Sequence, residues 1–283
     1  MKLLVTGAAG MLGRDVMLAA GNAGHDVVGF GHTELDVTDA AALGSKLEVE
    51  RPDVVINCAA WTDVDGAEEA EDQAMAVNGT GAGHVAAAAA EVGATVVYVS
   101  SDYVFDGAKG APYLESDQPA PLSAYGRTKL AGEEATTAAN PRHFVVRSSW
   151  LFGTGGGNFV ETMLRLAVDH GEVLVVHDQV GSPTYTWHLA YGIVRLIEGL
   201  EHGIHHMAAA GSCSWYEFAR EIFEQARVEC KVLGATTEML GRPAARPPYS
   251  ALASQREHAI ELPSWQDGLL GYLAQRQTER EAA

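Results

Sequence analysis

Tyr125 and Lys129 are the residues whose types and spacing first suggest chemistry. They stand four positions apart in a stretch with helical character, so a phenol and an ammonium group share one helix face. A tyrosine beside a cation can act as a general acid, because the positive charge favours phenolate and lowers the phenol pKa from about 10 toward the working pH. The same pair also arises by chance on surface helices, so other residues must support this interpretation.

Ser100 and Ser101 provide that support, because they follow an apolar, strand-like run that begins at residue 95. In parallel sheets the carboxyl ends of the strands gather at the edge where ligands bind. A serine hydroxyl at this edge can hold a carbonyl oxygen, although adjacent serines can also cap the next turn. The chemistry of the two residues does not choose between Ser100 and Ser101.

Three glycines indicate a second kind of site, directly after the first apolar run. Gly7, Gly10 and Gly13, with Met11 and Leu12 between the last two, stand where the chain passes from a strand into the first helix. Glycine lets the backbone approach a pyrophosphate, and the amides and dipole at the helix start attract its charge. A tight turn without a ligand is the alternative, but the position at the first strand-to-helix junction favours a dinucleotide cofactor.

The end of the second apolar run bears on the type of coenzyme. Residues 29–32 read GFGH and lack the acid that usually holds the ribose 2′-hydroxyl of NAD. Arg14 and His32 can instead meet a 2′-phosphate, which favours NADP over NAD, although an arginine in a first helical turn is just as often solvated. Asp36 and Val37 follow shortly and are expected to lie against the adenine.

The elements that must position these residues alternate between short apolar runs and longer alanine-rich stretches. Near-continuous apolar strands suit a parallel sheet covered on both faces, and the alternation is typical of βαβ units. The pattern predicts an α/β fold with a doubly wound parallel sheet of the Rossmann type. Strands are expected at residues 2–6, 26–30, 53–57, 95–100 and 143–147, and helices at residues 14–21, 40–50, 68–93, 125–139 and 159–169.

The pattern becomes less regular beyond residue 150, where prolines mark several loops. We predict an NAD(P)-binding domain over residues 1–150 and a smaller α+β substrate-binding region over residues 151–283. A segment near residues 180–205 is expected to return to the first domain. The second region should cover the carboxyl edge of the sheet, where ligands bind in such folds.

Composition argues against several classes of function. The chain of 283 residues has a formal charge of −18, so its surface repels phosphate backbones and anionic lipid, and no nucleic-acid partner is expected. No apolar run approaches the roughly 20 residues that span a bilayer, which argues against a membrane role. Cys58, Cys213 and Cys230 are typical of reduced thiols, and with no signal-like start they predict a cytoplasmic protein.

Seven stretches of the chain match a known family. They resemble the extended short-chain dehydrogenases and, among these, the dTDP-4-dehydrorhamnose reductases. The glycine trio and the Tyr-x-x-x-Lys pair belong to a large superfamily, whereas the runs SDYVFDG, RSSW and DQVGSPT are narrower signals. The matching stretches are residues 7–13, 35–39, 51–57, 101–107, 125–133, 147–153 and 178–184.

The resemblance implies a role for each candidate residue. It implies that Ser101, at a position usually held by threonine, orients the sugar carbonyl, that Tyr125 donates the proton, and that Lys129 is its electrostatic partner and a ribose ligand. The nicotinamide would deliver hydride to C4 of a dTDP-linked 4-keto-6-deoxysugar, giving dTDP-L-rhamnose or a related deoxysugar. The resemblance further implies that Ala60, Trp61, Thr62 and Val99 line the cofactor and that Asp102, Tyr103 and Trp150 touch the sugar. A core aromatic is the alternative for Trp150.

The last fifth of the chain departs from the family pattern. The family motif R-P-x-N-S-x-L-D is replaced by RPPYSALA at residues 246–253, without the Asn and the Asp. Arg246 can still pair with the diphosphate of a nucleotide sugar through its guanidinium fork, although a loop arginine that faces water is nearly as common. The nucleotide and the deoxysugar stay open at this point.

Other functions compete with the reductase. A nucleotide-sugar epimerase would keep NAD tightly bound. A non-catalytic, cofactor-binding regulatory subunit of the methionine adenosyltransferase type is disfavoured by the intact catalytic trio. His202, His205 and His206 lack an accompanying cysteine or carboxylate pattern, so no metal is expected. Heptads and long apolar stripes are missing, which leaves the oligomeric state open, with a homodimer as one option by analogy.

Overall fold

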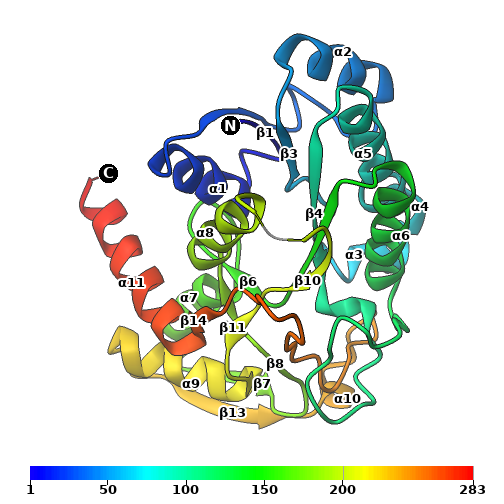
Figure 1. Cartoon of the computed structure of the whole chain (residues 1–283). Helices are drawn as coiled ribbons and strands as arrows, with labels where there is room; N and C mark the ends of the chain where they lie inside the picture. The colour runs from blue at the N-terminus through cyan, green and yellow to red at the C-terminus, as the bar shows by residue number, and fades with distance from the viewer. Residues whose placement is uncertain (200, 283) are drawn as a thin grey trace.

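The computed structural model of the chain describes residues 1–199 and 201–282. Its centre is a sheet of six parallel strands in the order β10-β5-β4-β3-β1-β2 (Figure 1). The strand order reverses at β1, which is the switch point where such sheets bind ligands. The predicted doubly wound parallel sheet is confirmed. The strands are β1 (Lys2–Thr6), β2 (Asp26–Phe30), β3 (Val54–Asn57), β4 (Thr95–Ser101), β5 (His143–Ser148) and β10 (Gly203–His206).

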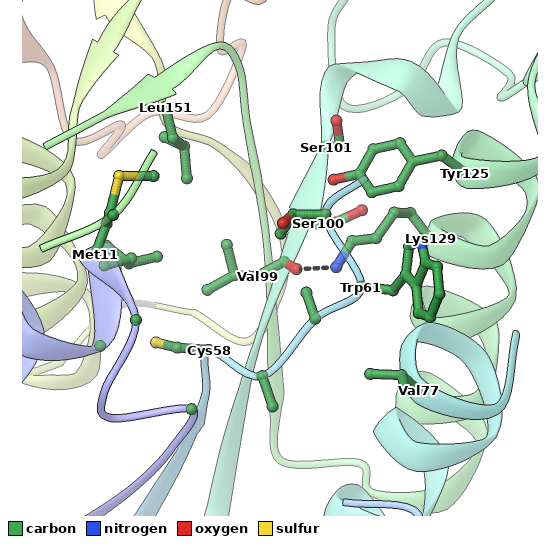
Figure 2. Close-up of a pocket in the computed structure, with 18 of the residues that line it drawn as sticks. Met11, Cys58, Trp61, Val77, Val99, Ser100, Ser101, Tyr125, Lys129 and Leu151 are labelled. Atoms are coloured by element: carbon green, nitrogen blue, oxygen red, sulfur yellow. Dashed lines mark hydrogen bonds between the residues drawn. The ribbon is translucent and has the colours of Figure 1, made fainter. Parts of the chain in front are cut away.

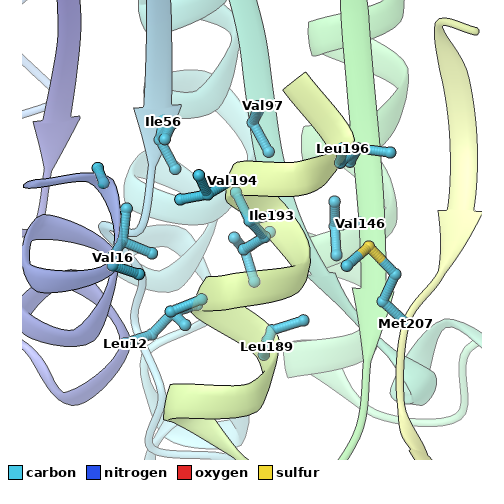
Figure 3. Close-up of a cluster of buried hydrophobic side chains, with 14 of the residues drawn as sticks. Leu12, Val16, Ile56, Val97, Val146, Leu189, Ile193, Val194, Leu196 and Met207 are labelled. Carbon is cyan, nitrogen blue, oxygen red and sulfur yellow. The ribbon is translucent and has the colours of Figure 1, made fainter. Parts of the chain in front are cut away.

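Helices cover both faces of this sheet, because successive side chains of each strand point to opposite faces. Leu3 and Val5 of β1 share a buried cluster with Leu12 and Ile193, which come from the helices α1 and α8 (Figure 3). Leu4 points to the other face and packs in a cluster with residues of α2 and α5. The helices are α1 (Met11–Asn22) and α8 (Thr186–Ile197) on the first face, and α2 (Ala40–Glu50), α5 (Ala82–Glu91) and α6 (Ala124–Ala139) on the second (Figure 1).

The long helix expected before the fourth strand is interrupted, which corrects the sequence prediction. Two short helices, α3 (Gly66–Glu69) and α4 (Glu71–Met75), lead through a π-helical segment, η1 (Ala76–Gly81), into α5. The π-helical segment carries Asn78, whose Nδ2 donates to the backbone oxygen of Trp61 and whose Oδ1 accepts from the Trp61 amide, at 3.1 and 2.9 Å. Segments of this kind often occur at functional sites, and this one fixes the loop that follows β3.

The rest of the chain packs around a second core at the carboxyl side of the sheet (Figure 1). Val160, Phe218 and Leu269 from three helices lie in this core, and β7 pairs in parallel with β13. The elements are α7 (Phe159–His170), α9 (Trp215–Ala226), α10 (Thr237–Leu240), α11 (Trp265–Ala282), β6 (Leu151–Phe152), β7 (Glu172–Val176), β8 (Val180–Gly181), β9 (Thr184–Tyr185), β11 (Ala209–Ala210), β12 (Cys213–Ser214), β13 (Lys231–Ala235) and β14 (Leu262–Ser264).

The two cores exchange a piece of chain. From Thr186 onward α8 packs on α1, and β10 then extends the main sheet beside β5. A domain boundary at residue 150 stays a prediction. No helix in the described part of the chain is long and apolar enough to cross a membrane.

Candidate active site

A cavity of about 1070 Å³ lies where the carboxyl ends of β1, β3 and β4 meet the C-terminal half of the chain. Its walls include both the glycine turn before α1 and the first two turns of α6, so the two candidate sites open into one space (Figure 2). The residues expected to bind or line the cofactor lie in this cavity, except Arg14, which was considered for a 2′-phosphate. These residues are Gly7, Gly10, Met11, Leu12, Gly13, Asp36, Val37, Ala60, Trp61, Thr62, Val99, Tyr125 and Lys129.

The glycine turn has no room for larger side chains. Gly7 has a φ of 66°, and a Cβ there would lie 2.6 Å from the backbone nitrogen of Ala59. A Cβ on Gly13 would lie 2.3 Å from the carbonyl oxygen of Gly7. Gly10 precedes α1 and offers no side chain to cap its first amides. An anion can take the place of the cap, so this turn fits a pyrophosphate group.

The two cations considered for a 2′-phosphate lie in different surroundings. His32 lines the cavity, is largely exposed, and its Nδ1 lies 3.9 Å from the carboxylate of Asp36. Hydrogen bonds from the amide and the hydroxyl of Thr38 lower the pKa of Asp36. Arg14 donates from Nε to the carbonyl oxygen of Ala9 at 3.0 Å and is thereby held against the glycine turn.

Lys129 is buried in the wall of the cavity between α6 and β4. Its Nζ donates to the carbonyl oxygen of Val99 at 2.6 Å (Figure 2) and lies 4.4 Å from the centre of the Tyr98 ring. Burial lowers the pKa of Lys129 to about 7, although the carboxylate of Glu133 acts in the opposite direction. The ammonium group is therefore fixed in place by a backbone oxygen.

Tyr125 lines the cavity one helical turn before Lys129. Burial raises the pKa of Tyr125 to about 12, and Asp102 adds to the rise while a hydrogen bond with Ser101 opposes it. The sequence analysis expected Lys129 to lower the pKa of Tyr125, and this expectation is wrong for the protein without its cofactor. The reason is that Lys129 directs its ammonium group to a backbone oxygen, so desolvation of the phenol dominates.

The structure distinguishes the two serines at the end of β4. Ser100 donates from Oγ to Oε1 of Glu133 at 2.5 Å, so its hydroxyl is already engaged. Ser101 donates to Oδ1 of Asp102 at 3.0 Å and accepts from the Tyr103 amide at 3.1 Å. Both serines line the cavity beside the ring of Tyr125 (Figure 2). Both hydroxyls thus donate to a carboxylate, and the difference is that the partner of Ser101, Asp102, lines the cavity whereas Glu133 does not.

Asp102 and Tyr103 begin a short 3-10 helix, η2 (Asp102–Val104), directly after Ser101. Burial raises the pKa of Asp102 to about 7, despite the hydrogen bonds that it accepts from Ser250, at 2.5 Å, and from Ser101. The ring of Tyr103 meets Tyr125 edge to face, with 5.8 Å between the ring centroids. Asp102 and Tyr103 both line the cavity, and the hydrogen bond from Ser250 also connects Asp102 to the loop between α10 and β14.

Trp150 lines the opposite wall and is not a simple core residue. Its backbone has a φ of 48°, a conformation that residues other than glycine rarely adopt. Its indole stacks on Trp215 with a centroid distance of 3.6 Å and an interplanar angle of 5°. A Cβ on Gly181 would lie 2.4 Å from this indole, so the ring is also packed against backbone.

Arg246 lies outside the cavity lining, near Tyr103. Its Nη2 donates to Oδ2 of Asp65 at 2.9 Å, and the side chain is 15% exposed. Arg242 shares the same carboxylate at 3.2 Å but is 60% exposed. Arg246, which is predicted to bind the diphosphate, is thus already paired with Asp65. A substrate diphosphate would have to displace Asp65 or bind the arginine together with it.

Several lining residues were missed by the sequence analysis. Trp215 follows Ser214, which caps α9, and nothing in its local sequence distinguishes it from a core aromatic. Cys58 lines the cavity at the end of β3, where burial raises the pKa of its thiol to about 12. The run Gly155-Gly156-Gly157 also lines the cavity, and its glycine content was a usable signal.

The three histidines considered as metal ligands have other neighbours, and the ring of His202 lies 4.9 Å from that of Phe144. His205 lies 2.8 Å from the carbonyl oxygen of Glu201 through Nε2. His206 places Nδ1 at 3.0 Å from the carbonyl oxygens of Tyr113 and Ala253. Across residues 1–199 and 201–282, no group of three His, Cys, Asp or Glu side chains is arranged to hold a metal ion.

Comparison with known proteins identifies the family. The sequence profile described as the RmlD substrate binding domain matches residues 1–278. The chain belongs to this family. The family predicted from the sequence motifs is thereby confirmed, and the RmlD match covers nearly the whole chain.

The relatives within and around the RmlD family agree with this assignment. A dTDP-4-dehydrorhamnose reductase of Streptomyces griseus is 44% identical, over 92% of this chain and 88% of the relative. A dTDP-4-dehydrorhamnose reductase of Mycobacterium tuberculosis is 44% identical, over 90% of this chain and 86% of the relative. A crystal structure of dTDP-4-dehydrorhamnose reductase from Bacillus anthracis, in complex with NADP, is 40% identical with a TM-score of 0.94, over 97% of this chain and 99% of that one.

Proposed function

We propose that this chain is a reductase that transfers hydride from NADPH to the C4 ketone of a dTDP-linked 4-keto-6-deoxysugar, giving dTDP-L-rhamnose or a related deoxysugar. The observation that carries the proposal is that one cavity joins a phosphate-binding glycine turn to Ser101, Tyr125 and Lys129. Relatives that are 44% identical over nine tenths of the chain are dTDP-4-dehydrorhamnose reductases. The substrate partner is accordingly a nucleotide sugar.

NADP is the cofactor that the chain fits best. The tight approach at Gly7 and Gly13 and the uncapped start of α1 suit a pyrophosphate. The end of β2 has no acid to hold a 2′-hydroxyl, and His32 reaches the cavity. The related structure from Bacillus anthracis is in complex with NADP. When bound, the reduced nicotinamide supplies the hydride.

Ser101 at the end of β4 and Tyr125 and Lys129 on α6 form one wall of the cavity, here called the β4–α6 wall. Its side chains supply the proton and orient the substrate carbonyl. Tyr125 remains protonated at neutral pH, because its pKa is raised to about 12, and it can donate this proton to the oxygen that develops at C4. Ser101 directs the same oxygen through its hydroxyl. With the cofactor bound, Lys129 would hold the ribose through its ammonium group, and its positive charge would favour the phenolate left after proton transfer.

The opposite wall and the C-terminal loop receive the rest of the substrate. Trp150 offers an aromatic surface to the sugar ring, and Asp102 and Tyr103 lie at the end of β4 to meet its hydroxyl groups. Arg246 lies beyond Tyr103 and is the candidate for the diphosphate. Free thiols at Cys58, Cys213 and Cys230 favour a reducing compartment, so we place the protein in the cytoplasm. The oligomeric state stays open, with a homodimer as one option.

The decisive experiment follows the absorbance of NADPH, and separately of NADH, with the enzyme and freshly made dTDP-4-keto-6-deoxy-L-mannose. We expect sustained oxidation of NADPH and a lower kcat/KM with NADH. Oxidation with NADH alone would reverse the coenzyme assignment. Cofactor binding without turnover would contradict the proposed substrate and would favour another nucleotide sugar or a cofactor-binding regulatory protein.

A further inference from the structure

A buried ion pair lies behind the β4–α6 wall and has no part in the mechanism above. The side chains of Arg147 and Glu133 are 2% and 5% exposed. Arg147 donates from Nε and Nη2 to the two carboxylate oxygens of Glu133, at 2.9 and 2.6 Å. Taking two charges out of water costs several kcal/mol per ion, and well-packed apolar replacements are often as stable. Stability alone therefore gives little reason for this pair.

The pair belongs to a polar row that crosses three strands. Ser100, Arg147 and His206 occupy adjacent positions on β4, β5 and β10. Glu133 reaches this row from α6. It accepts a hydrogen bond from the Ser100 hydroxyl at 2.5 Å, in addition to the two hydrogen bonds from Arg147. Nη1 of Arg147 lies 3.4 Å from Nε2 of His206. The row thus runs from the cavity wall to the edge strand of the sheet.

Glu133 also stands in line with the proposed catalytic groups. Tyr125, Lys129 and Glu133 follow at intervals of four residues, which places them along one face of α6. The carboxylate of Glu133 acts on Lys129 and favours its charged form. Ser100, which Glu133 engages, is the immediate neighbour of Ser101. A single carboxylate therefore acts on Lys129 and holds the serine next to Ser101.

Lys129 and Glu133 have charged or titratable neighbours on each of the elements that pack against them. Lys129 is faced by Tyr98 and the Val99 carbonyl of β4, by Cys58 after β3, and by Glu133. Glu133 is faced by Ser100, by Arg147 and by Tyr98, whose pKa is raised mainly by burial and further by Glu133. Beyond Arg147 lie His206 and Glu115, which accepts from the His206 amide at 3.1 Å. Glu133 is thus the negative charge on α6 that acts on Lys129.

We propose that Glu133 is a positioning residue of the reductase, which favours the ammonium form of Lys129 one helical turn away and holds the Ser100 hydroxyl by a hydrogen bond, away from the substrate carbonyl. This inference rests on the function proposed above. Arg147 donates to both carboxylate oxygens of Glu133 from β5 and so compensates the buried charge of Glu133. The costly pair therefore serves the reaction.

The test uses Glu133→Gln, which keeps the shape of the side chain and removes its charge. Without the carboxylate, the ammonium form of Lys129 is less favoured and is lost at lower pH. We expect the alkaline limb of kcat/KM to move down by about one pH unit, with roughly tenfold less activity above the limb, because the opposite charge near Lys129 is removed. Glu134→Gln, the same change at the exposed neighbouring position of α6, should leave the limb in place.

A second readout needs no sugar substrate. The dissociation constant of NADPH, followed by its fluorescence, should rise at a lower pH in Glu133→Gln than in the wild type, because Lys129 is a proposed ribose ligand. If the wild type binds NADPH but does not turn over the sugar, the proposed substrate fails while this readout still tests Glu133. Equal pH profiles for Glu133→Gln, Glu134→Gln and the wild type would overturn the proposal.

Two further variants separate positioning from mere structural support. Glu133→Asp keeps the charge and shortens the side chain, so we expect the alkaline limb to return to its wild-type position while kcat stays several-fold lower. If Glu133→Gln fails to fold, the double variant Glu133→Gln/Arg147→Gln removes both buried charges and should move the limb in the same direction by a smaller amount. A folded double variant with an unmoved limb would also overturn the proposal.

Discussion

The two walls of the cavity are built from different chemistry. The β4–α6 wall buries charged and ionisable groups, such as Lys129, Asp102 and the Glu133–Arg147 pair, and each of them has its own hydrogen-bond partners. The opposite wall, from the C-terminal half, presents the stacked indoles of Trp150 and Trp215. We infer that bond making depends on the first wall and that the second wall contributes aromatic contact to the sugar.

This division has an energetic reason. Fixed charges in a water-poor wall act strongly on a developing oxyanion, which lowers the barrier of the chemical step. Apolar and aromatic contact binds substrate and transition state about equally, which changes KM more than kcat. Variants on the two walls should therefore separate these two kinetic constants.

The largest effect is expected from Tyr125→Phe. Loss of the proposed proton donor should lower kcat by roughly 10²-fold or more, while the dissociation constant of NADPH changes little, because the ring and its edge contact with Tyr103 remain. Stopped absorbance assays and NADPH fluorescence measure the two quantities. An unchanged kcat would remove Tyr125 from the mechanism and with it the contrast between the walls.

Trp150→Ala should give the next largest effect, on the opposite wall. The sugar loses an aromatic surface, so we expect KM for the sugar nucleotide to rise roughly tenfold with kcat within about threefold of the wild type. Steady-state kinetics and near-UV circular dichroism provide the readouts. Loss of the near-UV signal through unfolding would instead show that Trp150 supports the core.

Arg246→Ala should have a smaller effect of the same kind. Because Asp65 already pairs with this arginine, we expect KM to rise only about threefold to fivefold, with kcat unchanged. Arg242→Ala is the matched control, since Arg242 shares Asp65 but is 60% exposed. Equal effects of the two variants would argue that Arg246 has no contact with the diphosphate.

The smallest effect concerns stability and pH. Burial raises the pKa of Asp102 from 3.8 to about 7, so between these values the unfolded chain releases the proton first and the folded protein loses stability as the pH rises. Asp102→Asn removes this cost. We expect its Tm to exceed that of the wild type by at least about 2 °C at pH 8 and by nothing at pH 4.

Asp178 provides a control of opposite sign. Burial raises the pKa of Asp178, but hydrogen bonds from Thr237 outweigh it and the net shift is downward, so its ionised form stabilises the fold. Stability from this group is present above the unfolded pKa and is lost as the pH falls through the folded pKa. Asp178→Asn should therefore lower Tm at pH 8, and thermal scans of both variants that shift in the same direction would contradict the assignment.

Much of the sheet could be predicted from the sequence. The bounds of β1, β2 and α2 agree with the apolar pattern, because each element is fixed by residues close together in the chain. The prediction of one continuous helix before β4 was wrong at η1. Asn78 in this segment makes hydrogen bonds with Trp61 and Thr128, and these residues lie outside the local sequence pattern. Tertiary contacts override local helix propensity at such points.

The sequence by itself determined the glycine turn, the spacing of Tyr125 and Lys129, and the strand that brings the serines to the same edge, since each depends on short-range geometry. Only the tertiary structure decided that Ser100 donates to Glu133, because these two residues lie 33 positions apart. It also decided the stack of Trp150 on Trp215 and the rise in the pKa of Tyr125. Burial and partner choice depend on which distant segments pack together, and a local pattern of residue types does not contain that information.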